Sequence, residues 1–98
     1  MTTLPKIIQI IQSHKKDLFT QFHVKKISIF GSYARGKQTN KSDLDVLVEF
    51  SQPIGFFKFM DLEEYLQKLL HTKIDLVTKK ALRSRIGKQI LKEIVPVH

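Results

Sequence analysis

Two segments in the first half of the chain have the polar and apolar pattern of strands. Residues 24–30 (VKKISIF) are rich in β-branched side chains and stop at Gly31, which predicts a strand that runs into a tight turn. In residues 43–50 the two-residue period of a strand places four apolar side chains on one face: Leu44, Val46, Val48 and Phe50. The opposite face carries Asp43, Asp45, Leu47 and Glu49. Two carboxylates therefore point the same way at the start of this strand.

Three further segments repeat apolar residues every three or four positions, which predicts helices packed on a sheet. The first begins at Thr2 or Thr3, has Pro5 in its first turn, and has an apolar face made of Leu4, Ile7, Ile8, Ile11, Leu18, Phe19 and Phe22. The histidines His14 and His23 do not have a metal-ligand spacing, and we expect both at the surface or at a helix end.

The other two helices are predicted over residues 56–71 and 81–94. The first of these has a wide apolar stripe, made of Phe56, Phe59, Met60, Leu62, Tyr65, Leu66, Leu69 and Leu70. We interpret its aromatic residues as core, with base stacking or partner binding by Phe56, Phe57 or Phe59 as the alternative. The last helix is predicted to turn inward Leu82, Ile86, Ile90 and Ile94 and to end at Pro96. Its outward residues are predicted to be Lys79, Lys80, Arg83, Arg85, Lys88 and Lys92.

A third strand is predicted at residues 74–77, with Thr78 able to cap the helix that follows. Asp75 is the one charged residue in this otherwise apolar segment. A buried carboxylate without a partner is very costly, so we expect Asp75 to meet a metal, a base or solvent. The elements together predict an α/β (α+β) fold with a small mixed sheet of three to four strands flanked by helices.

The paired carboxylates indicate a metal site. Neighbouring carboxylates raise each other's pKa and disfavour double ionisation, and a divalent cation removes this penalty. Their hard oxygen atoms suit Mg²⁺, which proteins commonly share between one or two carboxylates and substrate phosphates. Gly31 and Ser32 end a strand where a short helix can begin, so their backbone N–H groups and the Ser32 hydroxyl can face a phosphate. We expect Ser42 to fix the backbone just before Asp43.

Residues 31–37 (GSYARGK) also match the start of a P-loop, G-x-x-x-x-G-K. The match fails at Gln38, because a P-loop has Ser or Thr there to bind Mg²⁺. We interpret Gly36 instead as the C-terminal cap of a one-turn helix. The chain is also shorter than a parallel-sheet NTPase requires. For Tyr33 and Lys37 the pattern allows two orientations, toward substrate or toward water.

Length and composition predict one domain spanning residues 1–98, since the chain has room for one core. Cysteine is absent, which excludes disulfides and thiolate metal sites. We find no stretch of membrane-spanning length and no signal pattern, and we expect a cytoplasmic protein without membrane contact. The formal charge is +8, concentrated in residues 1–30 and 73–98, and would attract polyanions such as nucleotides, RNA or an acidic protein surface.

The segments GSYARG, SDLDVLVEF and KIDLVT together resemble the minimal nucleotidyltransferase family of the DNA polymerase β-like superfamily. The resemblance covers about residues 27–95, and its first two motifs are the specific ones. It implies that Asp43, Asp45 and Asp75 are catalytic residues that hold two Mg²⁺ ions. It also implies that Gly31 and Ser32 bind the β- and γ-phosphates of ATP, with help from Arg35.

The resemblance further implies in-line attack of an acceptor hydroxyl on the α-phosphate of a nucleoside triphosphate, with Asp75 as a candidate base for the acceptor proton. Family members are commonly antitoxins of a HEPN-domain ribonuclease toxin, so the implied activity is AMP transfer to a toxin side chain, with tyrosine as the expected acceptor, within a hetero-oligomer. One alternative is a non-catalytic antitoxin that neutralises its toxin by binding alone. A basic nucleic-acid-binding module is a further alternative that rests on charge only.

Overall fold

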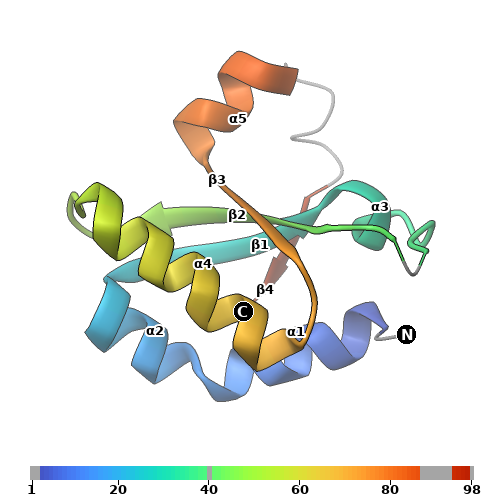
Figure 1. Ribbon diagram of the computed structural model, residues 1–98, viewed down its shortest axis with the longest axis horizontal. Helices are drawn as coiled ribbons and strands as arrows, with labels where there is room; N and C mark the ends of the chain where they lie inside the picture. Colours follow the sequence, from blue (N-terminus) through green and yellow to red (C-terminus); the bar gives the residue numbers. More distant parts are fainter. Residues whose placement is uncertain (1–2, 40, 87–93, 98) are drawn as a thin grey trace.

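The computed structural model describes residues 3–39, 41–86 and 94–97 of the chain. Its centre is a four-stranded mixed sheet with the strand order β3-β2-β1-β4 (Figure 1). The strands are β1 (Val24–Phe30), β2 (Leu44–Phe50), β3 (Ile74–Thr78) and β4 (Val95–Val97). Strand β1 pairs antiparallel with β2 and β4, whereas β2 and β3 are parallel. The predicted mixed α/β architecture is confirmed.

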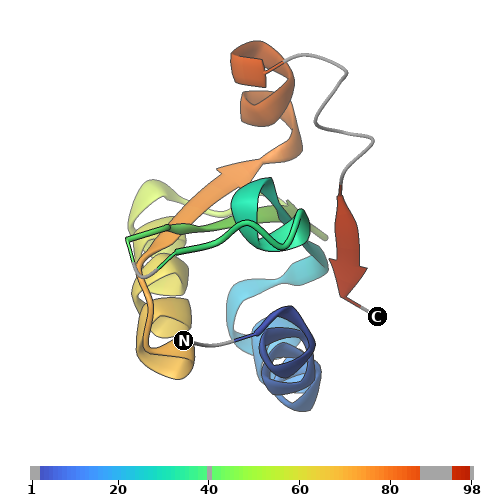
Figure 2. The same ribbon diagram turned by 90° about the vertical axis from the view of Figure 1, so that its right-hand side faces the viewer.

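Helices cover both faces of the sheet, but unequally. Three of them lie on one face: α1 (Leu4–Ser13), α2 (Lys15–Phe22) and α4 (Phe56–Leu70). Helix α5 (Lys79–Ile86) lies on the other face, and the one-turn helix α3 (Gly31–Ala34) follows the end of β1 (Figure 2). We call these two sides the three-helix face and the α5 face. None of the described helices combines the length and apolar character needed to cross a bilayer.

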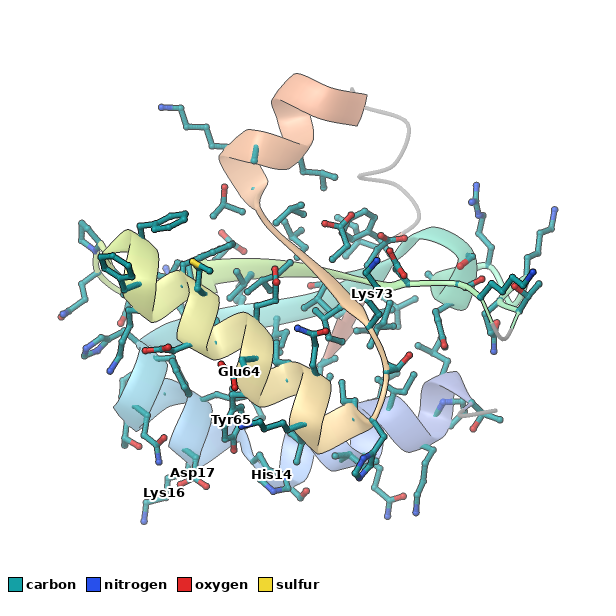
Figure 3. The ribbon with its side chains drawn as sticks, viewed as in Figure 1. His14, Lys16, Asp17, Glu64, Tyr65 and Lys73 are labelled. Atoms are coloured by element: carbon teal, nitrogen blue, oxygen red, sulfur yellow. The ribbon has the colours of Figure 1, made fainter. Side chains whose placement is uncertain are left out.

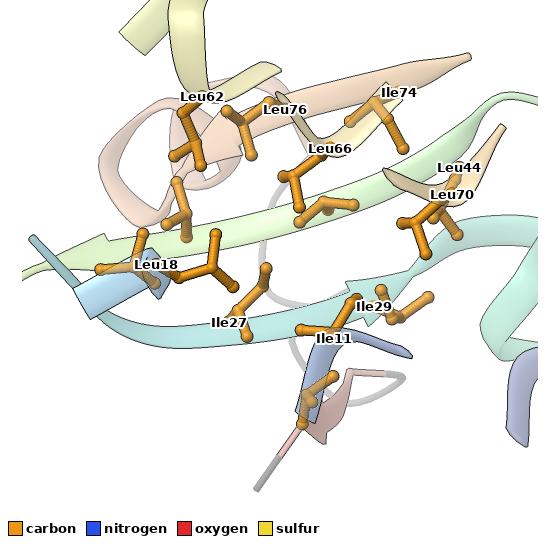
Figure 4. Packing of buried hydrophobic residues seen from close by; sticks show 14 of the residues in the cluster. Ile11, Leu18, Ile27, Ile29, Leu44, Leu62, Leu66, Leu70, Ile74 and Leu76 are labelled. Carbon is orange, nitrogen blue, oxygen red and sulfur yellow. The ribbon is translucent and has the colours of Figure 1, made fainter. Parts of the chain in front are cut away.

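The predicted alternation of strand β2 decides what each face contains. Leu44, Val46 and Val48 are fully buried in the main core beneath the three helices (Figure 4). Leu47 points to the α5 face and joins a smaller cluster with Phe30, Val77 and Leu82. The helical residues that close the main core include Ile7, Ile11, Leu18, Leu62 and Leu66.

The single helix predicted from Thr3 to Phe22 is two helices, because the chain breaks at His14. The Ser13 hydroxyl donates a 2.7 Å hydrogen bond to the Ile10 carbonyl, and the His14 ring contacts the same oxygen at 2.9 Å. Side chains that bind a nearby carbonyl compete with the helical backbone pattern. Thr3 is the N-cap residue, although its side chain makes no capping hydrogen bond, and His23 ends α2 in the left-handed conformation.

Three apolar residues predicted to face inward are instead exposed. The exposed fractions are 56% for Phe19, 71% for Phe56 and 51% for Met60, and the neighbouring Phe57 is 80% exposed. Their helical spacing is as predicted, but they lie at the margins of apolar stripes whose centres already fill the space against the sheet. Phe59 follows the core interpretation, because it packs partly buried against the main core.

The C-terminal prediction is correct at its start and wrong at its end. Thr78 caps α5 as predicted, accepting a 3.2 Å hydrogen bond at its hydroxyl from the Ala81 N–H, and Leu82 is fully buried. Ile94 is not helical, and Pro96 lies in β4 opposite Ser28. Proline is tolerated in such an edge strand because the N–H it lacks need not join a ladder.

Several predicted positions of the last helix cannot be compared with the structure. Residues 87–93, with Lys88, Ile90 and Lys92, lie outside the described residues, and the side chains of Arg83, Arg85 and Ile86 are likewise not described.

Helices α2 and α4 meet through aromatic rings. The Phe22 and Tyr65 ring centroids lie 5.3 Å apart, and Lys58 Nζ lies 5.5 Å from the centroid of Phe22. Figure 3 shows Tyr65 on the side of α4 that faces α2, where Asp17 lies. Burial, followed by the negative charge of Asp17, raises the pKa of the Tyr65 hydroxyl above its ordinary value of 10.0.

Candidate active site

The turn after β1 has the helix-ending geometry expected for Gly36. Helix α3 closes with the Arg35 N–H donating to the Gly31 carbonyl at 3.2 Å. The Gly36 N–H then donates to the Tyr33 carbonyl at 3.3 Å and the Lys37 N–H to the Ser32 carbonyl at 2.9 Å, which is a Schellman motif. Gly36 adopts a φ of 69° at this cap, so its interpretation as a helix cap rather than part of a P-loop is confirmed.

Gly31 brings the backbone of this turn directly against the carboxylate of Asp45. Its φ of 73° is a left-handed conformation that favours glycine. A Cβ atom at this position would overlap Asp45 Oδ2 and lie only 2.9 Å from Asp45 Cγ. The strand pairing explains the contact, because Phe30, the residue before Gly31, lies opposite Asp45 in the β1–β2 ladder. The predicted phosphate-binding turn and the predicted metal-binding strand are therefore immediate neighbours.

Asp45 and Asp75 are direct neighbours in the parallel pairing of β2 with β3. Paired residues in adjacent strands lie about 5 Å apart and point to the same face. Both side chains are half-buried on the α5 face, beside the small cluster of Phe30, Leu47 and Val77. Asp43 is also half-buried and lies one residue before the first residue of β2. The structure thus places the three predicted acids at one end of the sheet, where β2 and β3 begin.

A hydrogen bond from Leu44 fixes this end of the sheet. The Leu44 N–H donates to the Lys73 carbonyl at 2.8 Å, which ties the start of β2 to the residue before β3. The preceding loop is held by Ser42, whose hydroxyl accepts a 2.9 Å hydrogen bond from the Thr39 N–H. This contact confirms the expectation that Ser42 fixes the backbone before Asp43.

The chemistry of the three acids fits Mg²⁺. Among residues 3–39, 41–86 and 94–97, no three His, Cys, Asp or Glu side chains already converge on a point where they would hold a metal ion. Mg²⁺ does not require such a cage, because it retains several waters and is commonly bound by one or two carboxylates together with substrate phosphates. The adjacent Asp45 and Asp75, with Asp43 beside them, are carboxylates of this kind next to the turn at Gly31.

The other predicted positions at the turn divide into accessible and buried ones. Ser32 is half-buried and Arg35 is exposed, so both are within reach of solvent or a ligand. Lys37 is exposed as well. Tyr33 faces neither substrate nor water, because it is 4% exposed and belongs to the main core, so both orientations considered for it are wrong.

Lys73 is a positioning residue that sequence reasoning missed. Its carbonyl, not its charge, aligns the strand beginning at Leu44 with the strand that carries Asp75. The only signal in the sequence is its place immediately before the apolar segment of β3, because a backbone contact of this kind is independent of side-chain type.

Comparison with known proteins identifies the family. The model of the nucleotidyltransferase domain family matches residues 4–97. The protein adenylyltransferase MntA of Thermococcus cleftensis is 46% identical over 97 residues, which cover 99% of this chain and 98% of the relative. This identity over nearly the full length of both chains shows common family membership.

Solved structures share the fold. A toxin–antitoxin structure with AMP-PNP has a TM-score of 0.74 at 22% identity, covering 93% of this chain and 72% of the other. A complex of a tri-AMPylated HEPN toxin of Shewanella oneidensis with its MNT antitoxin has a TM-score of 0.66 at 18% identity, covering 94% and 69%. The fold, the motifs and the full-length relative agree, and the chain belongs to the nucleotidyltransferase domain family as a minimal nucleotidyltransferase enzyme.

Proposed function

We propose that this enzyme transfers AMP from ATP to a hydroxyl group of a HEPN-domain toxin and thereby acts as its antitoxin. The observation that carries the proposal is the contact between the Gly31 backbone and the Asp45 carboxylate, with Asp75 paired to Asp45 in the next strand. A turn suited to phosphate and acids suited to a metal ion would then act at one point, as phosphoryl chemistry requires. The similarity to a protein adenylyltransferase and to complexes of HEPN toxins supports the same interpretation.

The residues of the turn would bind the triphosphate. The first N–H groups of a helix have no intrahelical acceptor, so those at the start of α3 are available to phosphate oxygens. Gly31 allows close approach of the backbone, the Ser32 hydroxyl adds a donor, and the Arg35 guanidinium adds positive charge. These groups would hold the β- and γ-phosphates and leave the α-phosphate beside the acids.

The three acids would hold Mg²⁺, in a two-metal arrangement that includes Asp43, Asp45 and Asp75. Bound Mg²⁺ would supply electrostatic stabilisation of the attacking and leaving oxygens. In the proposed transfer the acceptor oxygen forms a bond to the α-phosphorus, the bond to the bridging oxygen breaks, and pyrophosphate leaves. Asp75 would accept the proton of the acceptor hydroxyl. Its pairing with Asp45 in the adjacent strand supports this role.

The test is AMP transfer to the toxin encoded by the neighbouring gene, measured by intact-mass spectrometry with ATP and Mg²⁺. We expect a mass increase of the toxin, and we expect the Asp43→Asn/Asp45→Asn variant to transfer more than about 100-fold more slowly. Glu49→Gln is the matched control, because Glu49 lies on the same face of β2 but four residues from Asp45. It should retain the activity of the unaltered protein.

Two results would contradict the proposal in different ways. A stable complex with the toxin and no mass increase with ATP, GTP, CTP or UTP would favour neutralisation by binding alone. Binding of RNA that ignores Asp43 and Asp45 and weakens steeply with salt, without toxin binding, would favour the basic nucleic-acid-binding module.

A further inference from the structure

A pocket of about 150 Å³ opens between α2, the start of β1 and the end of β4. Three of its lining residues are lysines and none is acidic: Lys15, Lys25 and Lys26. The remaining lining is apolar and comes from Leu18, Val24, Ile27 and Val97. Ile27, the lining residue nearest the turn along β1, lies four residues before Gly31, which corresponds to about 13 Å along the strand, and no candidate residue of the active site lines the pocket. The pocket is therefore separate from the candidate active site.

A β-bulge creates the pair of adjacent lysines in this pocket. In the β1–β2 ladder Val24 lies opposite Phe50 and Lys26 opposite Glu49, so Lys25 is an extra residue without a partner in the ladder. The bulge interrupts the alternation of the strand, and Lys25 and Lys26 are both exposed while Val24 and Ile27 on either side are both buried. Lys25 therefore stands at the edge of a pocket with an apolar floor, whereas the pairing of Lys26 with Glu49 turns the Lys26 side chain toward the α5 face.

The positive charge of this pocket is not neutralised within the described part of the chain. None of Lys15, Lys25 and Lys26 takes part in an ion pair there. Phe19 does not line the pocket, but it lies one helical turn after Lys15 on the same side of α2 and is 56% exposed. Within the described residues, this surface therefore combines lysines that form no ion pair with accessible apolar area.

The size of the pocket defines what it can accept. An apolar cavity of about 150 Å³ can hold benzene, so this pocket accommodates one aromatic or branched aliphatic side chain. The surrounding ammonium groups favour carboxylates on both sides of that residue, and the net charge of +8 favours an acidic partner at longer range. The floor is aliphatic and offers no aromatic platform of the kind that stacks nucleic-acid bases.

We propose that this pocket docks an acidic segment of the partner protein. One apolar side chain of the segment enters between Leu18 and Ile27, and flanking Asp or Glu residues pair with Lys15 and Lys25. The identification of the partner as the toxin rests on the proposed function. A buried apolar anchor surrounded by charged contacts is the arrangement found at energetic centres of protein interfaces. The pocket would hold the toxin while the acceptor hydroxyl reaches the distant acids.

The decisive variant is Lys15→Glu/Lys25→Glu, with Lys6→Glu/Lys79→Glu as the matched control. Both variants change the net charge by the same amount, and Lys6 and Lys79 are exposed residues outside the pocket. Toxin affinity is measured by isothermal titration calorimetry at low and high salt. We expect the pocket variant to bind at least about tenfold more weakly and the control to stay within about threefold. Carbodiimide cross-linking should join the pocket lysines to toxin carboxylates.

A second variant guards against misfolding. Phe19→Ser leaves the lysines in place and alters an exposed side chain, so it should fold and should weaken toxin binding several-fold. Saturating toxin should restore the rate of AMP transfer in the lysine variant and in Phe19→Ser, because docking affects KM and the acids determine kcat. If the unaltered protein binds the toxin without transferring AMP, the proposed function fails and the affinity comparison still tests the docking site.

Four outcomes would overturn this proposal. Equal weakening in the pocket and control variants would show an effect of net charge alone. Unchanged toxin affinity in the pocket and Phe19→Ser variants would place the interface elsewhere. If the lysine variant lost binding to a labelled single-stranded RNA but still bound the toxin, the lysines would be assigned to nucleic-acid binding. Failure of the unaltered protein to bind the toxin at all would overturn this proposal together with the proposed function.

Discussion

The two faces of the sheet are formed by the same strands but are used differently. The three-helix face is covered by α1, α2 and α4 and forms the main core, in which Leu44, Val46 and Val48 are fully buried. The α5 face is divided, since one part is the small cluster around Leu82 and the other part carries Asp45 and Asp75. Because side chains alternate along a strand, adjacent residues contribute to the core on one face and carry the candidate catalytic acids on the other.

Because the two faces differ in this way, we expect stability and activity to respond to different substitutions. Asp45 and Asp75 lie on strands whose opposite face is anchored in a packed core, and rigid elements of this kind position a site more accurately than loops do. Substitutions on the three-helix face should therefore lower stability while folded protein keeps its activity. Substitutions on the α5 face should affect activity first.

The largest expected effect comes from Leu66→Ala. Leu66 is fully buried in the main core, and we expect the substitution to lower the free energy of unfolding by about 3–5 kcal/mol. Leu82→Ala removes an equally buried side chain from the small cluster, where α5 has fewer neighbours to hold it in place, and we expect a loss of about 2 kcal/mol. Urea unfolding measures both. A larger loss for Leu82→Ala would contradict the division of the two faces.

The next effect tests the contact between the turn and Asp45. Gly31→Ala should lower the free energy of unfolding by about 2–3 kcal/mol, because a left-handed backbone is strained for alanine and the new Cβ collides with the carboxylate. Gly36→Ala is the control, since Gly36 has a similar φ of 69° but a Cβ added there would meet no atom within 4 Å, and it should cost about 1 kcal/mol.

The same two variants distinguish a loss of stability from a loss of activity. Gly31→Ala displaces the Asp45 carboxylate, so AMP transfer should fall at least about tenfold, whereas Gly36→Ala should keep most of its activity. Transfer is followed by intact-mass spectrometry under conditions in which both proteins remain folded. Equal activity of the two variants would mean that the close approach of Gly31 to Asp45 has no part in the reaction.

The smallest effect concerns the packing of α4 on α2 and appears only at high pH. The pKa of Tyr65 is raised in the folded protein, so the unfolded chain loses this proton first as the pH rises above about 10. The stabilisation is complete below that pH and is lost as the pH rises through the folded-state pKa. Tyr65→Phe should flatten this part of the Tm profile.

The Asp17→Asn variant tests which cause raises the pKa of Tyr65. Burial is the larger cause of the raised pKa and the charge of Asp17 is the smaller one. The Asp17→Asn variant should therefore reduce the decline of Tm above about pH 10 by less than Tyr65→Phe does. An equal effect of the two substitutions would contradict this order and make the charge of Asp17 the larger cause of the raised pKa.

The features that the sequence predicted are those that depend on local periodicity. The alternation of residues 44–50 correctly assigned Leu44, Val46 and Val48 to the core, and the Gly31 and Gly36 positions correctly indicated the turn. The helix over 56–70 followed from its apolar stripe. The roles of Asp43, Asp45, Asp75, Ser32 and Arg35 remain predictions, although the structure gathers these residues around one turn and one end of the sheet.

The features that the sequence did not reveal depend on contacts between distant segments. The exposure of Phe19 and Phe56 depends on how far the sheet extends beneath each helix, which periodicity within a helix does not report. The break at His14 results from side chains that bind the Ile10 carbonyl, and β4 forms because residues 95–97 meet the free edge of β1. The close approach of the Gly31 backbone to the Asp45 carboxylate likewise arises only after β1 and β2 pair.

The topology also sets the order in which the site can assemble. Gly31 and Asp45 belong to two strands joined by one short connection, whereas Asp75 reaches Asp45 only after the chain has crossed over through the whole of α4. Contacts between segments far apart in sequence form more slowly than local ones, because a longer loop must close first. A chain still emerging from the ribosome would thus bring the turn at Gly31 against Asp45 before Asp75 joins them, and the three acids would come together only in a nearly finished fold.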